Sequence, residues 1–236
     1  MASHPLQNRL LRALPPRERE RLLPQLSLVS LLPGATLHEQ AEVLSHLYFP
    51  IDSIVSLLRV MKDGATAQLA LAGNEGVVGI GLFLGQPAAT SRAVVQSAGH
   101  AYRLERSRLR EELSLEGGLR ALLQEYTGRL LAQISQTAAC TRHHSVHQQF
   151  CRWLLMSLDR LPGSELVMTQ ELLATTLGVR RERLTEAASR LQAAGLIRYS
   201  RGRITVLDRP RLEQASCECY GSNQGSSAPH LCAAAI

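Results

Sequence analysis

The residues best suited to binding chemistry lie in the segment from Val179 to Arg190, which reads VRRERLTEAASR. Guanidinium groups form paired hydrogen bonds with guanine edges and with phosphates, and carboxylates can accept from cytosine amino groups. If the segment is helical, its polar side chains share one face. That face consists of Arg180, Arg181, Glu182, Arg183, Thr185, Glu186 and Arg190. Its composition predicts contact with double-stranded DNA.

The surrounding sequence supplies elements that would position this face. A first amphipathic helix is expected over 169–177 with Thr169 as its cap, and Gly178 follows where a chain can turn with positive φ. A second helix, the recognition helix, is expected over 180–194. Two short apolar runs at 196–197 and 204–207 then predict a hairpin. This order is typical of a winged helix-turn-helix, whose second helix lies in the major groove. The alternative is a small helical pair with a solvated arginine face, which leaves the hairpin unexplained.

Composition sets the remaining bounds. The 236 residues are enough for two domains, and a net charge of +6 favours a polyanionic partner. Lys62 is the only lysine, so the number of arginines is weak support on its own. No apolar run approaches the ~20 residues that span a bilayer, and the first residues do not resemble a signal peptide. Five cysteines in a chain of this length do not form a disulfide scaffold. These features predict a soluble cytoplasmic protein.

The first hundred residues alternate short apolar segments with turn signals, after two helical segments at 7–14 and 16–23. One hairpin is expected from 54–60 and 67–72 around Lys62-Asp63-Gly64. Another is expected from 94–97 and 101–104 around Ala98-Gly99. Several short strands at this spacing predict a small barrel or jelly roll.

A long helix is expected over 115–142, and a further amphipathic helix over 148–160. Apolar side chains recur along the long helix at steps of three and four residues. We expect this stripe to form a dimer interface through Leu119, Leu123, Tyr126, Leu130 and Ile134. The alternative is that the stripe packs only on the β-rich domain of its own chain.

This layout resembles the Crp/Fnr superfamily of bacterial transcription regulators. The matching motifs are Pro33-Gly34-Ala35-Thr36-Leu37, Tyr48-Phe49-Pro50, Gly79-Ile80-Gly81-Leu82-Phe83, Gly178-Val179-Arg180-Arg181-Glu182-Arg183 and Gly202-Arg203-Ile204-Thr205-Val206. The resemblance implies an α+β protein with an N-terminal β jelly roll similar to cyclic-nucleotide-binding domains, a long dimerisation helix and a C-terminal winged helix-turn-helix. We expect these units at 10–114, 115–142 and 145–215, followed by a disordered tail at 221–236.

The resemblance also implies roles for individual residues. Arg181 and Glu182 match the base-reading arginine and glutamate of the family, and a third reader, often arginine, falls at Glu186. Glu186 either accepts from a cytosine or pairs with Arg183 or Arg190 and reads no base. Phosphate contacts are expected from Gln170, Arg180 and Arg183, and the expected DNA-binding set is completed by Thr169, Thr185 and Arg203.

The expected effector pocket departs from the relatives that bind cyclic AMP. Those relatives use a glutamate for the ribose and an arginine about six residues later for the phosphate. Here the glutamate position falls at Gly79, and the arginine position falls at Ala89 or near Ser91 and Arg92. We therefore expect a degenerate pocket at Gly79, Ile80, Gly81, Leu82, Ser91 and Arg92 that does not bind cyclic AMP tightly. No cofactor is predicted, and the identity of any effector stays open.

The segment from Cys140 to Cys151, CTRHHSVHQQFC, could present a metal ligand set if it were one continuous helix. The set would be Cys140, His143, His144, His147 and Cys151. Histidines are common in exposed helix junctions, so we expect no metal site here. Iron–sulfur binding is disfavoured because no cysteine precedes Cys140, and Cys217 and Cys219 follow the last expected domain.

The sequence lacks a G-x-S-x-G elbow, a Walker loop and an H-E-x-x-H helix, so we do not expect an enzyme. The prediction is a homodimeric transcription regulator that binds DNA in a sequence-specific way, with RNA polymerase as a further partner. The resemblance implies that a shift of the long helix repositions the two recognition helices. Two alternatives stay open, namely a haem- or metal-dependent sensor and a protein-interaction module that does not bind DNA.

Overall fold

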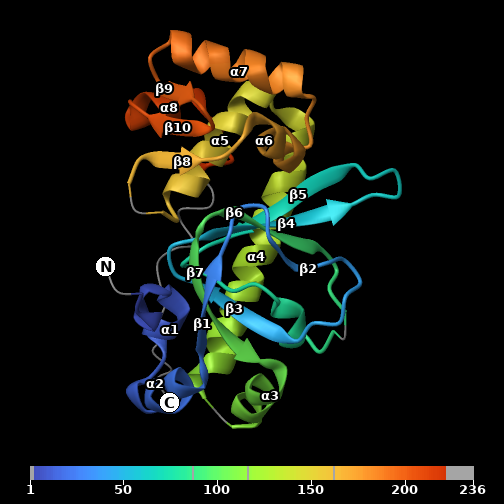
Figure 1. Ribbon diagram of the computed structural model, residues 1–236, viewed down its shortest axis with the longest axis vertical. Helices are drawn as coiled ribbons and strands as arrows, with labels where there is room; N and C mark the ends of the chain where they lie inside the picture. Colours follow the sequence, from blue (N-terminus) through green and yellow to red (C-terminus); the bar gives the residue numbers. More distant parts are fainter. Residues whose placement is uncertain (1–2, 87, 116, 162, 222–236) are drawn as a thin grey trace.

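The long helix α4 (Gly118–His143) runs along a β-roll formed by the first half of the chain, and the C-terminal domain lies beyond its far end (Figure 1). The computed structural model describes residues 3–86, 88–115, 117–161 and 163–221. The predicted tail at 221–236 therefore lies outside the described residues except for Gly221. Helices and strands both contribute, so the predicted α+β class is confirmed.

Short helices lead into the roll: η1 (Pro5–Gln7), α1 (Arg9–Ala13), α2 (Pro16–Leu22) and η2 (Leu23–Gln25). Asn8 is fully buried and caps α1 through Oδ1, which accepts from the amides of Leu10 and Leu11. Its Nδ2 donates to the carbonyls of Pro50 and Gly76, both at 2.9 Å. One satisfied amide thus anchors the lead segment to the roll.

The β-roll consists of two antiparallel sheets. Its elements are β1 (Ser27–Leu31), β2 (Thr36–His38), β3 (His46–Pro50), β4 (Ile54–Val60), β5 (Thr66–Ala72), η3 (Ile80–Leu82), β6 (Arg92–Ser97) and β7 (Gly99–Glu105). One sheet has the order β1-β7-β3 and the other β2-β6-β4-β5. The predicted β4–β5 hairpin is confirmed by their direct pairing.

The second predicted hairpin, between 94–97 and 101–104, is wrong. Both strands exist, but β6 pairs with β2 and β4, whereas β7 pairs with β1 and β3. Gly99 has φ +156°, and a Cβ there would lie 2.6 Å from the Asp52 carbonyl oxygen. Asp52 Oδ1 also accepts from the amide of His100. The chain crosses from one sheet to the other at this close approach instead of folding back on itself.

The helix α3 (Arg106–Ser114) precedes α4, and α4 packs on the roll through its apolar stripe. Leu119, Leu123, Tyr126 and Leu130 are buried within the core of the roll, and Ile134 packs at its edge. The Tyr126 ring covers Gly76, where a Cβ would lie 2.2 Å from the ring, and its hydroxyl donates to the Val77 carbonyl. The first four of these side chains are covered by their own chain and Ile134 is partly covered, which favours the stated alternative for this stripe, and its predicted role as a dimer interface stays a prediction.

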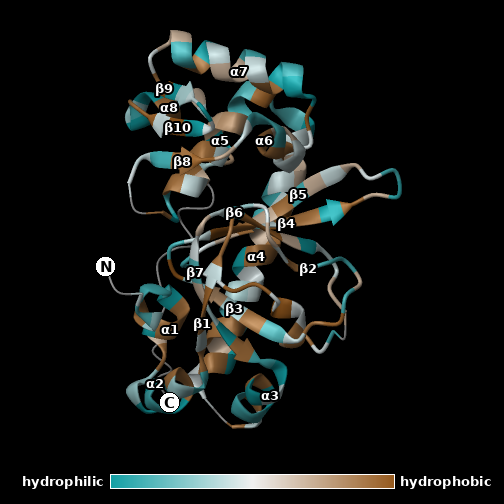
Figure 2. Cartoon of the chain, in the orientation of Figure 1, coloured by the Kyte–Doolittle hydropathy of each residue, from teal (hydrophilic) through white to brown (hydrophobic). Residues whose placement is uncertain are grey.

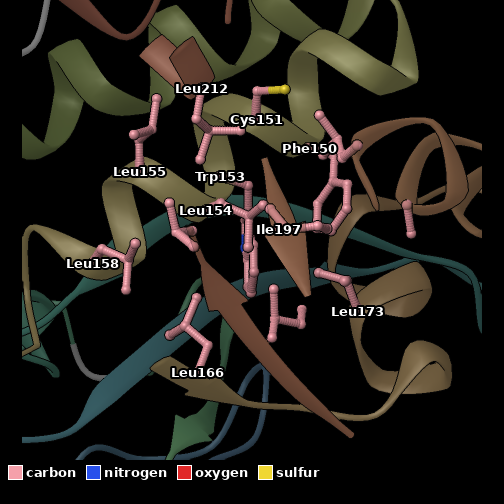
Figure 3. Close-up of a cluster of buried hydrophobic side chains, with 14 of the residues drawn as sticks. Phe150, Cys151, Trp153, Leu154, Leu155, Leu158, Leu166, Leu173, Ile197 and Leu212 are labelled. Atoms are coloured by element: carbon pink, nitrogen blue, oxygen red, sulfur yellow. The ribbon is translucent and has the colours of Figure 1, made fainter. Parts of the chain in front are cut away.

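The C-terminal domain begins with α5 (Val146–Leu158), nearly all of which is buried. It continues with β8 (Glu165–Val167), α6 (Gln170–Leu177), α7 (Arg181–Ala193), β9 (Ile197–Ser200), β10 (Arg203–Val206) and α8 (Arg209–Ala215). Phe150, Trp153 and Leu154 of α5 lie at the centre of its core, facing Leu173 of α6 and Ile197 of β9 (Figure 3). The strands form one sheet in the order β8-β10-β9. The sequence pattern predicted β9 and β10 but not β8 or α8.

Hydropathy follows this architecture, because α7 alternates hydrophilic and hydrophobic residues along its turns while the strands of the roll carry apolar segments (Figure 2). None of the helices in the described part of the chain combines the length and apolar character that a bilayer crossing requires.

Candidate nucleic-acid interface and effector pocket

The helix α6 has a capping threonine at its N-terminal end and a glycine at its C-terminal end, where the chain turns towards α7. Thr169 Oγ1 accepts from the Leu172 amide at 3.2 Å, which confirms its predicted role as the α6 cap. Gly178 has φ +65°, and its amide bonds to the last turn of α6. An L side chain adopts this conformation only with strain. The glycine therefore allows the chain to reverse and direct α7 across α6.

The helix α7 is held from beneath by a small apolar core. Leu184, Ala187, Ala188 and Leu191 are buried against α5 and α6, together with Leu173. The opposite face is exposed to solvent at the end of the molecule (Figure 1). It carries every polar residue predicted there: Arg180, Arg181, Glu182, Arg183, Thr185, Glu186 and Arg190.

The exposed residues differ in whether their charges are already satisfied. Glu186 Oε1 forms an ion pair with Arg190 Nη2 at 2.5 Å, one of the two arrangements expected for it. Among the described residues, Arg180, Arg181 and Arg183 form no ion pair within 4.0 Å. The Thr185 hydroxyl donates to the Arg181 carbonyl one turn earlier. Three guanidinium groups thus remain available at the start of α7.

Two further elements lie beside the outer face of α7, namely α6 and the β9–β10 hairpin, which is the wing of the motif. Gln170 is the first residue of α6 and is half-buried. Arg203 on β10 is exposed but pairs with Glu165 of β8 at 2.5 Å. Arg198 on β9 and Arg201 in the β9–β10 turn are also exposed, and neither was among the predicted residues. Their positions between the two predicted apolar runs at 196–197 and 204–207 were the signal that would have included them.

The roll touches the helix-turn-helix directly, a contact that the sequence did not indicate. Thr66, at the start of β5, donates its hydroxyl to the Thr175 carbonyl of α6 at 3.0 Å. A Cβ on Gly178 would lie 3.2 Å from the Thr66 carbonyl oxygen. The start of β5 therefore lies against the turn that directs α7.

The predicted effector segment contains no acidic side chain. Gly79 has φ +93°, and a Cβ there would lie 2.7 Å from the His46 carbonyl oxygen. A glutamate at this position would require the backbone to move. Ile80 and Leu82 lie in η3 and pack against the core of the roll, and Gly81 lies between them.

The candidate phosphate ligand is also occupied. Arg92 Nε lies 3.2 Å from Glu39 Oε1, and its Nη2 donates to Thr36 Oγ1 at 3.2 Å. Ser91 is buried. Nearby, His38 is buried, and this burial lowers the pKa of its imidazole.

The interior of the roll is filled by apolar side chains from both sheets. This cluster includes Phe49, Val55, Leu57, Ala70, Ala72, Ala93 and Val95. Such a lining offers no hydrogen-bonding partner for a phosphate or a ribose.

Two family models match this chain. The Crp-like helix-turn-helix domain matches residues 148–215, and the cyclic nucleotide-binding domain matches residues 28–115. Together they cover more than half of the chain. No curated protein sequence gives a significant match.

Many solved structures share the fold. FixK2 from Bradyrhizobium japonicum has 16% identity and a TM-score of 0.67, with 81% of this chain and 98% of that chain covered. A CRP-family transcriptional regulator from Thermus thermophilus has 17% identity and a TM-score of 0.67, with 80% and 96% covered. The c-di-GMP-responsive regulator CLP from Xanthomonas campestris has 19% identity and a TM-score of 0.62, with 80% and 97% covered.

The two matched domains occur in the order expected from the sequence, on either side of α4. Crp/Fnr regulators are DNA-binding proteins that typically dimerise, and they are not enzymes. The matched domains and the shared fold together show that this chain belongs to the Crp/Fnr superfamily of transcription regulators.

Proposed function

We propose that the chain binds specific DNA sequences as a homodimer and that its roll no longer binds cyclic nucleotides tightly. The observation that carries the DNA-binding part is the outer face of α7. Its first turn presents Arg180, Arg181 and Arg183, all exposed and without ion pairs among the described residues. Unpaired guanidinium groups at the start of a recognition helix suit both base edges and phosphates.

Within this face the residues have different proposed roles. Arg181 and Glu182 read base edges, while Arg180, Arg183 and Gln170 contact phosphates and fix the register on the duplex. Glu186 is held by Arg190 at 2.5 Å, which supports a role as its ion-pair partner and not as a base reader.

The proposed dimer uses the face of α4 that the roll leaves uncovered. Its exposed positions follow steps of three and four residues and are mostly small: Ala121, Gln124, Gly128, Leu131, Ser135 and Ala138. Leu131 lies at the middle of the helix and is 64% exposed. Small residues at this spacing let two helices approach closely, and a leucine between them supplies a knob. A second copy of α4 is the proposed occupant.

Sedimentation of a Leu131→Glu variant tests this interface. We expect the wild type to sediment as a dimer and the variant as a monomer. Leu115→Glu is the control, because Leu115 is also exposed but lies before α4. Dimers that survive Leu131→Glu would exclude this face as the interface.

The proposal of a degenerate pocket rests on Gly79, Arg92 and the apolar interior. The position expected for the ribose-binding glutamate has no side chain, and Arg92 is paired with Glu39. Loss of one hydrogen bond to a charged group costs about 1.5–3 kcal/mol, or roughly one to two powers of ten in affinity. We therefore propose that no tight cyclic AMP complex forms. RNA polymerase stays a proposed partner, with the exposed Lys62-Asp63-Gly64 tip as one accessible loop.

The deciding experiment is selection of bound sequences from random duplex DNA, with and without cyclic AMP, at two salt concentrations. We expect an enriched palindrome without the nucleotide and an affinity that falls steeply with salt, because phosphate contacts release counterions. Enrichment only with cyclic AMP would overturn the proposed loss of nucleotide binding. Failure to enrich any sequence, with a flat salt dependence, would favour a protein-interaction module.

A further inference from the structure

Four potential metal ligands converge where α4 meets α5, although they come from two distant parts of the chain. Cys140 lies in the last turn of α4, His144 is its C-cap, and Cys217 and Cys219 follow α8. One ligand atom from each residue lies within 4.8 Å of all the others. The three cysteines are buried and form no disulfide.

This group differs from the set considered in the sequence, where no metal site was expected. The helix is interrupted, because α4 ends at His143 and Ser145 caps α5 through a hydrogen bond with Gln148. The common face that a continuous helix would give to Cys140, His143, His144, His147 and Cys151 therefore does not exist. Only Cys140 and His144 remain from that set, and the other two ligands come from the segment after α8.

We propose that Cys140, His144, Cys217 and Cys219 bind one Zn²⁺ ion in a structural site. Zinc bonds of about 2.0–2.1 Å to nitrogen and 2.3 Å to sulfur place tetrahedral ligand atoms about 3.5–3.8 Å apart. The Sγ atoms of Cys140 and Cys217 are 3.6 Å apart, and Cys219 Sγ is 3.5 Å from His144 Nδ1. An iron–sulfur cluster contains several metal atoms and holds its ligands further apart than a single ion does.

The surroundings of His144 match those of a zinc-bound imidazole. Its Nδ1 faces the sulfur atoms, and its Nε2 lies 3.2 Å from the Glu218 carboxylate. Histidine ligands commonly donate their second ring N–H to a carboxylate, which fixes the tautomer and the orientation of the ring. Glu218 therefore orients the ligand and does not itself bind the ion.

Arg152 is a buried cation whose charge an anionic metal site would balance. Three thiolates and Zn²⁺ carry a net charge of −1. Arg152 is only 6% exposed, and its positive charge is close enough to act on the Cys140 thiol. It donates to Thr137 Oγ1 at 3.3 Å, its Nε has no hydrogen-bond partner, and no carboxylate pairs with it among the described residues. An anionic metal centre would compensate this buried cation.

The site has a clear structural consequence. All four coordination positions are filled by the protein, which is typical of structural and not of catalytic zinc. The ion would tie the segment after α8 to the end of α4, so the DNA-binding domain would be fixed at the junction that sets its orientation.

The test is the metal content of the full-length chain, purified under reducing conditions without a chelator. We expect about one zinc per chain by elemental mass spectrometry in the wild type. The Cys140→Ser/Cys217→Ser double variant is expected to contain none. Cys151→Ser is the matched control, because Cys151 is also a buried cysteine but is not a member of the group.

Two measurements on the wild type keep the test independent of how the double variant folds. Replacement of zinc by Co²⁺ is expected to produce a thiolate charge-transfer absorption, and alkylation of Cys140, Cys217 and Cys219 is expected only after chelation. A wild type without zinc that also fails to take up Co²⁺ would overturn the proposal. So would iron with acid-labile sulfide, a Cys140–Cys217 disulfide, or full zinc content in the double variant.

Discussion

The outer face of α7 and the interior of the β-roll differ in whether they offer polar groups to a ligand. On α7, Arg180, Arg181 and Arg183 are exposed and have no ion-pair partner among the described residues. In the roll, the interior is apolar and Arg92 is paired with Glu39. The molecule thus has one surface with charged groups that are free to bind a ligand. In its other region, the ligand-binding groups expected from the family are absent or already paired. The difference shows why function has to be argued from each site and not from the shared fold.

The largest effect is expected at the exposed arginines of α7. Replacing Arg181 by alanine should reduce affinity for the selected DNA sequence by about 5- to 150-fold, since a base-reading arginine contributes about 1–3 kcal/mol. Fluorescence anisotropy with a labelled duplex measures this change. Arg190→Ala is the control on the same helix, and its effect should be smaller because Glu186 already holds Arg190. Equal losses in both variants would contradict the proposed division between free and paired arginines.

The filled interior of the roll is tested by adding volume to it. Ala70 on β5 is 2% exposed and belongs to the core cluster of the roll. Ala70→Leu should lower the free energy of unfolding by about 1–3 kcal/mol, because extra methylene groups do not fit a well-packed core. Urea unfolding measures the loss, and Ala65→Leu at the exposed tip of the same hairpin is the control. A stable Ala70→Leu protein would reveal an open cavity and weaken the contrast with α7.

Gly178 tests the contact that connects the two regions. Alanine there would adopt φ +65° and place its Cβ 3.2 Å from the Thr66 carbonyl oxygen. We expect a loss of about 1–2 kcal/mol, which corresponds to a melting temperature lower by about 2–8 °C. Thr175→Ala is the control, because only the backbone carbonyl of Thr175 takes part in the contact. An unchanged melting temperature would mean that the start of β5 moves away from the added Cβ without loss of stability.

The smallest expected effect concerns His38 at the edge of the roll. Burial lowers the pKa of this imidazole, against the opposing influence of Glu42 and Glu39. The unfolded chain, with a histidine pKa of about 6.5, then binds the proton more readily than the folded chain. The free energy of unfolding should fall as pH decreases through about 6.5 towards the folded-state pKa, and level off below that value.

Urea unfolding at a series of pH values measures this dependence. A His38→Gln variant should lose less stability than the wild type over the same range, and the remaining slope belongs to the other titrating groups. Identical slopes in the two proteins would show that His38 does not titrate differently on folding.

Local patterns predicted the elements whose neighbours are close in sequence. The helix-turn-helix was identified because Thr169, Gly178 and the apolar spacing of α7 all act within a few residues. The β4–β5 hairpin was found for the same reason. The β6–β7 pairing was wrong because both strands have turn residues between them but find their partners in different sheets.

The missed parts of the site depend on distant contacts. The periodic stripe on α4 identified an apolar face, but periodicity does not reveal whether the roll or a second chain covers it. The pair Cys140 and Cys217 is separated by 77 residues, so spacing alone gave no reason to group them. The Thr66–Thr175 contact, 109 residues apart, is of the same kind.

The length of α4 has a consequence for how the roll can influence DNA. Its 26 residues rise about 1.5 Å each, which gives a rigid rod of about 39 Å. A tilt of about 5° at the Gly118 end would move the far end by about 3 Å, close to the ~3.4 Å between successive base pairs. A rearrangement within the roll too small to change its fold would therefore displace the domain beyond α4 by about the rise of one base pair.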